Sequence, residues 1–413
     1  IWLEVWLAGC LLTIGWCMSV LINALESARA EIYPFSDERV RVEAWTKVIG
    51  ILATGTAVIP QLILWAIFTL PLRLGFSIFF AACVSLSMVA TSTLCDAQQP
   101  CTGERASLKE AWEVLCKPPM MHATAARFWN SAADTTIKNF TIYYLTLIDG
   151  LASTDRATSL ALAGAVVGVV EILLIPFWAW LWSGKSNHLL GRRVPSMQTA
   201  CILFHVLAAV IPPLMLRLLP LLGTPRPWEW IAWFLVVHVL YSAQPFFRTN
   251  AFCWAVDDDC HHSDGRRREA VHAGIAKLFE EEGRAVTIVL VLGLGWLGLQ
   301  TTNCELRCKT ELDRGACVTG CELDDIANQP PLVLEYITFV LTYVVPAFGL
   351  LSAFHIWCFP IHGERLQALQ RTQAVNFKDT RAISKNSDPV EAGPDAGSDL
   401  VEEGPPTPDY QGT

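Results

Sequence analysis

Nine long apolar stretches set the strongest constraint on what this 413-residue chain can fold into. Each holds about 20 residues or more with few charges, the helix length that crosses roughly 30 Å of hydrocarbon. Charged residues make up only 17% of the chain, against about 25% in soluble proteins. This pattern predicts an all-α, polytopic membrane protein and argues against a soluble enzyme. The predicted spans are residues 1–25, 45–68, 75–94, 122–148, 157–182, 196–222, 228–256, 271–300 and 332–359.

Lys and Arg are unevenly distributed over the loops between these spans. Alternate loops, beginning with the one after the first span, carry most of them, including Arg39, Lys47 and Arg267. Because loops rich in Lys and Arg stay in the cytoplasm, the first span should run inward and the C-terminus should be cytoplasmic. We expect an integral protein of the plasma membrane. The chain opens with Ile1 inside an apolar stretch and has no charged leader, so we also expect a sequence that lacks its beginning.

Composition divides the expected chain into four parts. Residues 1–94 are predicted to form a partial N-terminal bundle of three helices, and residues 122–360 a C-terminal bundle of six. Residues 95–121 are a polar cytoplasmic connector in which 106–116 has the pattern of a short amphipathic helix. Residues 361–413 form a cytoplasmic tail, whose last part is rich in Pro, Gly and acidic residues and is predicted to be mostly disordered.

Motifs of enzymes and of nucleic-acid-binding proteins are missing from the sequence. It has no nucleophile elbow, phosphate-cradling glycine loop or metalloprotease helix, and no basic stripe. We therefore expect no enzymatic chemistry, no metal or organic cofactor and no nucleic-acid partner. The expected partners are the lipid bilayer and a small solute.

Four segments of the chain are similar to one group of membrane transporters. Asp258, Gly265, Arg267 and Glu269 have the spacing of its cytoplasmic signature, and Glu31 and Arg39 match a second motif. Segments 107–111 and 175–193 match two more. Together, in this order, they resemble the glycoside–pentoside–hexuronide:cation symporter family, which includes melibiose permease and belongs to the major facilitator superfamily.

The resemblance covers roughly residues 1–371 and implies that the nine spans are helices four to twelve of a twelve-helix bundle. It implies a monomeric secondary active symporter that moves a sugar or related solute with sodium or a proton by alternating access. A cytoplasmic gate of salt bridges would then include Glu31, Arg39, Asp258, Arg267 and Glu269. Two features depart from the family: Glu281 stands where helix eleven usually has Lys, and the helix that holds its cation-binding acids is absent from this chain.

Two other functions stay open. Residues 358–370 also resemble the lysolipid-transporting relatives in the superfamily, so this stretch does not identify the substrate and a sodium-coupled lysolipid carrier is the alternative. Loss of the family's Lys is also compatible with a non-transporting receptor or scaffold built on a transporter fold.

Charged residues inside apolar spans are candidates for solute or ion binding, because they cost several kcal/mol there and normally face a water-filled path. Asp134 and Lys138 lie one helical turn apart and so share a face with Asn130. Glu171 stands alone in its span, whereas Lys277, Glu280, Glu281 and Arg284 form a stripe near the start of another. Each set also has a structural interpretation: a self-satisfied packing pair, a carboxylate paired with another helix, or a solvated turn. The candidates for solute and ion binding are Asp134, Lys138, Glu171, Gln244, Arg248, Lys277 and Glu281.

Two sets of His and Cys residues complete the prediction. His205 and His238 are interpreted as packing residues within spans. Cys304, Cys308, Cys317 and Cys321 stand in one loop on the predicted outer side, where disulfides persist. We expect two disulfides with the pairing left open, and regard a zinc site as the weaker alternative.

Overall fold

The structure is a computed structural model of the whole chain. It describes residues 26, 32–33, 35–63, 82, 85–86, 107–151, 153–182, 188–189, 192–193, 196–218, 226–263, 268–308 and 313–372. The predicted span 1–25, nearly all of 75–94, Glu31, Arg267 and the tail beyond residue 372 lie outside these residues. All elements named below belong to one compact unit, Ile1–Leu369, and Gln370–Thr413 forms a second unit.

The described chain is almost entirely helical, which confirms the all-α prediction. Its two short strands, β1 (His188–Leu189) and β2 (Arg192–Arg193), pair antiparallel as a small hairpin. The longer elements are α2 (Ser36–Ile63), α5 (Pro118–Tyr143), α6 (Ser153–Trp182), α7 (Met197–Leu218), α8 (Arg226–Tyr241), α9 (Gln244–His262), α10 (Glu269–Trp296) and α14 (Val345–Cys358). The shorter helices are α4 (Leu108–Leu115), α11 (Cys304–Arg307), α12 (Arg314–Ala327) and α13 (Pro331–Phe339), and π turns η1 (Tyr144–Ile148) and η3 (Val340–Val344) extend α5 and join α13 to α14.

Four helical segments of the described chain are long and apolar enough to cross a membrane. They are Thr158–Trp182, Met197–Leu218, Trp228–His262 and Pro331–Cys358, and each coincides with a predicted span. Helices α5 and α10 match two further predicted spans in position, but residues such as Arg127 and Glu280 interrupt their apolar sequence. The protein is therefore a helical membrane protein.

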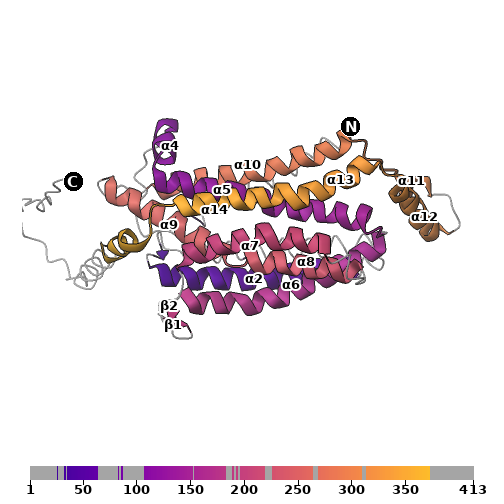
Figure 1. The fold of residues 1–413 in the computed structure, drawn as a ribbon. Helices are drawn as coiled ribbons and strands as arrows, with labels where there is room; N and C mark the ends of the chain where they lie inside the picture. The colour runs from indigo at the N-terminus through magenta and orange to yellow at the C-terminus, as the bar shows by residue number, and fades with distance from the viewer. Residues whose placement is uncertain are drawn as a thin grey trace, which may run out of the picture. The chain divides into compact units, whose positions relative to one another are not determined.

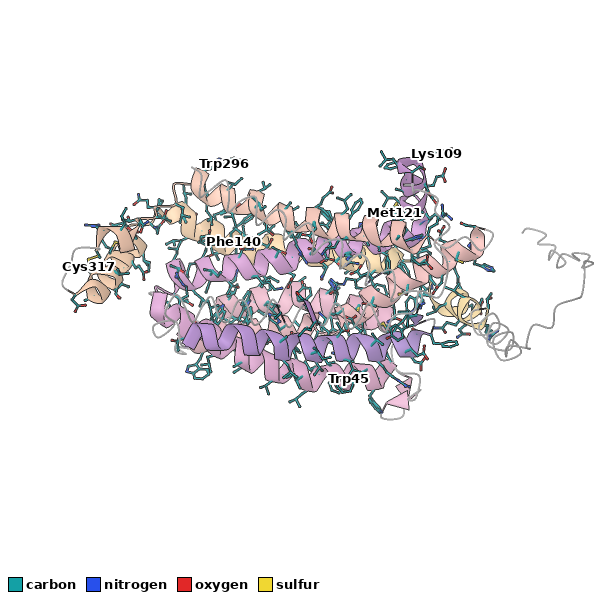
Figure 2. All side chains as sticks on the ribbon, turned by 180° about the vertical axis from the view of Figure 1, so that it is seen from behind. Trp45, Lys109, Met121, Phe140, Trp296 and Cys317 are labelled. Carbon is teal, nitrogen blue, oxygen red and sulfur yellow. A yellow bond between two sulfur atoms is a disulfide. The ribbon has the colours of Figure 1, made fainter. Side chains whose placement is uncertain are left out.

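The helices are arranged side by side in one bundle (Figure 1). Helix α5 packs between α10 and α14, and α14 also packs against α7. On the other side, α2 packs against α6 and α9. The short helix α4 stands at one end of the bundle, and α11 and α12 lie at the opposite end, where Cys317 is labelled in Figure 2.

The two largest apolar clusters of the described residues stabilise the bundle. One joins the ends of α6, α7, α9 and α14 through side chains such as Trp178, Phe246 and Phe359. The other joins α5, α8, α10 and α13 around Phe140 and Trp230. Helices α5, α6, α8 and α9, which these clusters hold in place, also line the cavity described in the next section.

Helix α10 approaches α5 unusually closely at Gly283. A Cβ atom at this position would lie 2.3 Å from the backbone oxygen of Phe128. The close approach allows Ser131 Oγ to donate to Glu280 O over 2.8 Å, and the hydroxyls of Thr136 and Thr287 to bond over 2.9 Å. Glycine is therefore required here by the distance between the two helices.

Candidate functional site

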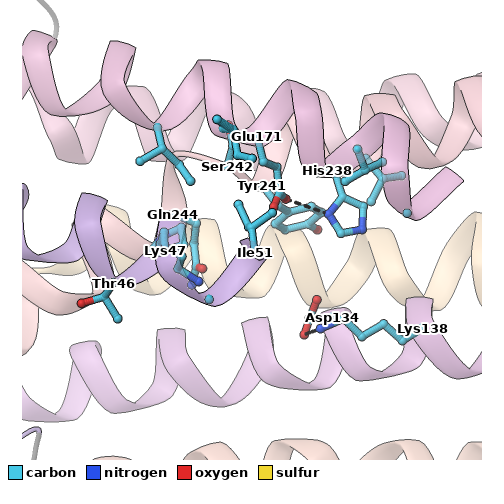
Figure 3. Close-up of a pocket in the computed structure, with 18 of the residues that line it drawn as sticks. Thr46, Lys47, Ile51, Asp134, Lys138, Glu171, His238, Tyr241, Ser242 and Gln244 are labelled. Carbon is cyan, nitrogen blue, oxygen red and sulfur yellow. Dashed lines mark hydrogen bonds and ion pairs between the residues drawn. The ribbon is translucent and has the colours of Figure 1, made fainter. Parts of the chain in front are cut away.

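A cavity of about 1050 Å³ lies between α2, α5, α6, α8 and α9. Figure 3 shows side chains from these helices pointing into it, among them Lys47, Asp134, Glu171 and His238. Its ionisable and amide side chains are Glu26, Glu43, Lys47, Asn130, Asp134, Lys138, Glu171, His238, Tyr241, Gln244 and Arg248.

Five predicted site residues meet at this cavity. Asp134 and Lys138 come from α5, Glu171 from α6, and Gln244 and Arg248 from α9. The sequence placed them in three separate spans, and the packing of the helices brings them to one space. Lys277 and Glu281, in contrast, belong to a different group of charges on α10.

Asp134 and Lys138 form an ion pair at the cavity wall. Lys138 Nζ donates to Asp134 Oδ2 over 2.6 Å. The two side chains are 50% and 58% exposed, so the pair is not closed off inside the bundle. The predicted shared face is confirmed, and because both groups are accessible they can exchange their mutual bond for bonds to a solute.

Glu171 is paired with another helix, one of the two alternatives that the sequence left open. Its Oε1 lies 3.0 Å from Nδ1 of His238 on α8. The imidazole of His238 also packs on the ring of Phe234, with the ring centroids 4.4 Å apart. His238 thus packs against a neighbouring ring, as interpreted from the sequence, and it also bonds a carboxylate and lines the cavity.

Lys47 is a cavity residue that the sequence analysis counted with a cytoplasmic loop, at the start of the predicted span 45–68. Helix α2 begins at Ser36, nine residues before the predicted span, so Lys47 lies about three turns inside the helix. Its ammonium group interacts electrostatically with Glu43, Glu171 and Asp134, and with Arg248 by repulsion. The signal for this position was the spacing of Glu43, Lys47 and Ile51 on one helical face, since all three line the cavity.

A second set of polar contacts joins α2 to α9 beside the cavity, at the end of the bundle where α2 begins. Arg39 is fully buried, and its Nη2 donates to Asp257 Oδ2 over 3.0 Å. Ser36 Oγ donates to Asn250 Oδ1 over 2.9 Å, and Thr249 Oγ1 to Glu43 Oε2 over 3.0 Å. We call these three contacts the α2–α9 seal, with members Ser36, Arg39, Glu43, Thr249, Asn250 and Asp257.

Two of the predicted gate residues, Arg39 and Asp258, bond residues outside the predicted set. Arg39 pairs with Asp257, which the signature spacing did not include. Asp258 instead accepts two bonds from Arg365 Nη2, over 2.9 and 3.0 Å. Glu269 is the first residue of α10.

The third aspartate of this run, Asp259, holds a different part of the bundle. Arg268 donates to it over 2.7 and 3.0 Å, and Lys117 forms an ion pair with it. Three consecutive aspartates on α9 therefore bond α2, the segment after α14, and the start of α5 with the start of α10. The sequence showed an acidic run but not this division of partners.

A buried charge network around Arg127 was not predicted. Arg127 donates to both carboxylate oxygens of Glu26, over 3.0 and 2.6 Å, and to Glu280 Oε2 over 2.7 Å. Lys277, also buried, pairs with Glu281 over 2.7 Å, although the Glu281 side chain is 43% exposed. The stripe on α10 is thus buried on one side and exposed on the other.

The four loop cysteines form two nested disulfides, Cys304–Cys321 and Cys308–Cys317. They join α11 and α12 in a small hairpin. Among the described residues, no group of three or more His, Cys, Asp or Glu side chains is arranged to hold a metal ion. The four sulfurs are used in disulfides and not as zinc ligands.

The fold and the cavity define a helical membrane protein with a charged space enclosed by several of its helices. In comparisons with known proteins, no family model matches the chain and no curated protein sequence matches it significantly.

Proposed function

We propose that this protein is a secondary transporter that moves a small polar solute, together with a cation, by alternating access. The cavity carries the proposal, because it gathers Lys47, Asp134, Lys138, Glu171 and Arg248 from four helices of a membrane protein. Charged side chains at membrane depth are tolerated where they line a water-filled path. A purely structural cluster would be closed to water, whereas Asp134 and Lys138 are half exposed.

The mixed charge of the cavity favours a polar solute. Acidic and basic groups both line it among apolar side chains such as Leu160 and Ile172, so hydroxyl groups of a solute find acceptors and donors. A sugar matches this lining, in line with the family resemblance of the sequence. The cavity also has apolar walls, from residues such as Leu160, Val167 and Ile172, so a lysolipid is tested beside the sugars.

The α2–α9 seal supplies the element that alternating access needs. It lies next to the cavity and consists of bonds between two helices from distant parts of the chain. For the cavity to open at that end, the bonds of Arg39 with Asp257, Thr249 with Glu43 and Ser36 with Asn250 must break. Opening at the other end can leave them intact.

The test is uptake by the full chain reconstituted in lipid vesicles. The probes are radiolabelled methyl galactoside, xylose, glucuronate and lysophosphatidylcholine, each with an imposed sodium or pH gradient. We expect accumulation of at least one of the three sugars. Accumulation of lysophosphatidylcholine alone would replace the sugar carrier with a lipid carrier, and no uptake of any probe would favour a receptor or scaffold.

Asp134→Asn provides the first variant for this test. It removes a charge from the cavity wall and leaves Lys138 without its ion-pair partner, so accumulation against a gradient should be lost. Glu113→Gln on α4, an exposed acid far from the cavity lining, is the matched control and should transport normally. Unchanged accumulation in Asp134→Asn would remove this residue from the site.

A further inference from the structure

The contact between Glu171 and His238 joins two helices at the wall of the cavity. Glu171 comes from the middle of α6 and His238 from the last turn of α8, and Oε1 and Nδ1 lie 3.0 Å apart (Figure 3). Their side chains are 27% and 23% exposed, and both line the cavity. The pair is therefore mostly buried, and both side chains are still partly exposed where they line the cavity.

Every element packed around the pair contributes ionisable groups that face the same space. Helix α2 contributes Glu43 and Lys47, α5 contributes Asp134 and Lys138, α8 contributes Tyr241, and α9 contributes Arg248; Glu26 lines the cavity as well. Of these, Lys47 is attracted electrostatically to Glu171. Asp134 already has a cationic partner in Lys138.

The chemistry of these groups singles out one pair. Arginine keeps its proton near neutral pH, Asp134 is ion-paired with Lys138, and Glu26 and Glu43 accept bonds from Arg127 and Thr249. Histidine is the side chain that changes its charge between about pH 5 and 8. A carboxylate in contact stabilises the protonated ring. His238 is the histidine that lines this cavity, and Glu171 is its carboxylate.

We infer that Glu171 and His238 form the site at which this protein binds and releases its coupling proton. This inference rests on the proposed transport function and makes it more specific, because it selects a proton over sodium. In the unloaded pair, neutral imidazole donates its Nδ1–H to ionised Glu171. A proton from cavity water binds at Nε2, gives imidazolium and leaves the Nδ1–H bond in place. Release to water at the other face reverses this step, so no bond other than N–H is made or broken.

Proton binding also changes the attraction between helices. The unloaded pair carries one negative charge, which attracts Lys47 on α2. Loading neutralises the pair and weakens the attraction between α2 and α6, which pack against each other. A proton therefore alters the contact between the helix that carries the α2–α9 seal and the helix that carries Glu171.

The first test compares pH-driven uptake in wild type, Glu171→Gln and His238→Asn. With one proton per solute, a gradient of one pH unit can drive about tenfold accumulation of radiolabelled methyl galactoside. In both variants, uptake should stop when the galactoside concentrations inside and outside the vesicles are equal. Exchange of labelled for unlabelled galactoside should continue, because it needs no net proton movement. Glu113→Gln and His261→Asn, outside the cavity lining, are the matched controls. Unimpaired pH-driven accumulation in either cavity variant overturns the inference.

A second measurement does not depend on any solute. Infrared difference spectra of the full chain between about pH 8 and pH 5 record histidine-ring protonation. We expect one component to be absent in His238→Asn and to be altered in Glu171→Gln, since the ring has then lost the carboxylate that it contacts. Spectra identical to wild type in both variants overturn the proton site.

The two measurements separate failure of the site from failure of the transport function. If no probe is transported but the infrared component is present and depends on both residues, the proton site stands and the transport proposal falls. If galactoside uptake responds to a sodium gradient and not to pH, the transporter stands and the proton site falls.

Discussion

Arg39 illustrates how much a single buried charge constrains this protein. Its guanidinium is fully buried, donates to Tyr33 O over 2.6 Å and pairs with Asp257 over 3.0 Å. A buried charge contributes little net stability when it is paired, but leaving it without its partner is expensive. The contact thus holds α2 and α9 in one arrangement, because a shift that separates Arg39 from Asp257 would leave a buried charge without its partner.

Asp257→Asn tests this contact. The variant leaves the Arg39 charge buried without its carboxylate, so we expect the free energy of unfolding to fall by about 3–5 kcal/mol. Asp37→Asn breaks the exposed pair of Asp37 with Arg41, 3.5 Å apart, and should cost about 1 kcal/mol or less. Thermal unfolding in detergent measures both, and equal losses in the two variants would contradict the role of burial.

At the scale of the element, helix α10 combines two features that its sequence does not reveal together. On its side facing α5 it has no side chain at Gly283, and this permits the close approach to the backbone of Phe128. Its first turns also carry Lys277 and Glu280 into the buried Arg127 network. The helix is therefore held by close packing and by charge, rather than by an apolar stripe alone.

Substitution by alanine at two glycines of α10 should change the stability of the protein in opposite directions. Gly283→Ala puts a methyl group 2.3 Å from Phe128 O, so the helices must move apart, at a cost of about 1–3 kcal/mol. Gly295→Ala meets nothing within 4 Å and should stabilise the helix by up to about 1 kcal/mol, since alanine is the better helix former. Melting temperatures of the two variants should therefore shift in opposite directions; a shift in the same direction would refute the close approach.

At the scale of the whole molecule, the cavity exists because segments far apart in the chain meet. Its wall combines α2, α5, α6, α8 and α9, and its neighbouring seal joins residues near position 40 to residues near position 250. The proposed transport cycle therefore depends on relative movement of α2 and α9. A covalent bond between them should stop it.

Cross-linking tests that dependence. Ser36 and Asn250 are hydrogen bonded over 2.9 Å, so Ser36→Cys with Asn250→Cys, joined by a short bifunctional thiol reagent that a reductant cleaves, should abolish methyl galactoside uptake. Uptake should return on reduction, because the cross-link and not the substitutions blocks movement. Each single cysteine variant, treated in the same way, is the control for modification of one introduced thiol. Treated wild type is the control for reaction of the reagent and the reductant with the native cysteines. Full uptake in the cross-linked protein would show that the seal need not open.

The sequence predicted those features that depend on neighbours along the chain. Hydropathy over a window of helix length located the four spanning segments, and spacing by one helical turn placed Asp134 beside Lys138 on one face. Four cysteines in a short loop indicated disulfides, although the pairing Cys304–Cys321 and Cys308–Cys317 required the hairpin of α11 and α12. The acidic run Asp257–Asp259 was visible, but its three separate partners were not.

Only the tertiary structure decided which helices face one another and with which side. Glu171 meets His238, Arg39 meets Asp257, and Lys47 enters the cavity because of how α2, α6, α8 and α9 pack and rotate. A local pattern fixes the face of a helix on which a charge lies, but not the helix opposite it. The sequence by itself therefore determined four apolar helices of membrane length and several of their charged residues, and packing determined which side chains meet at the cavity.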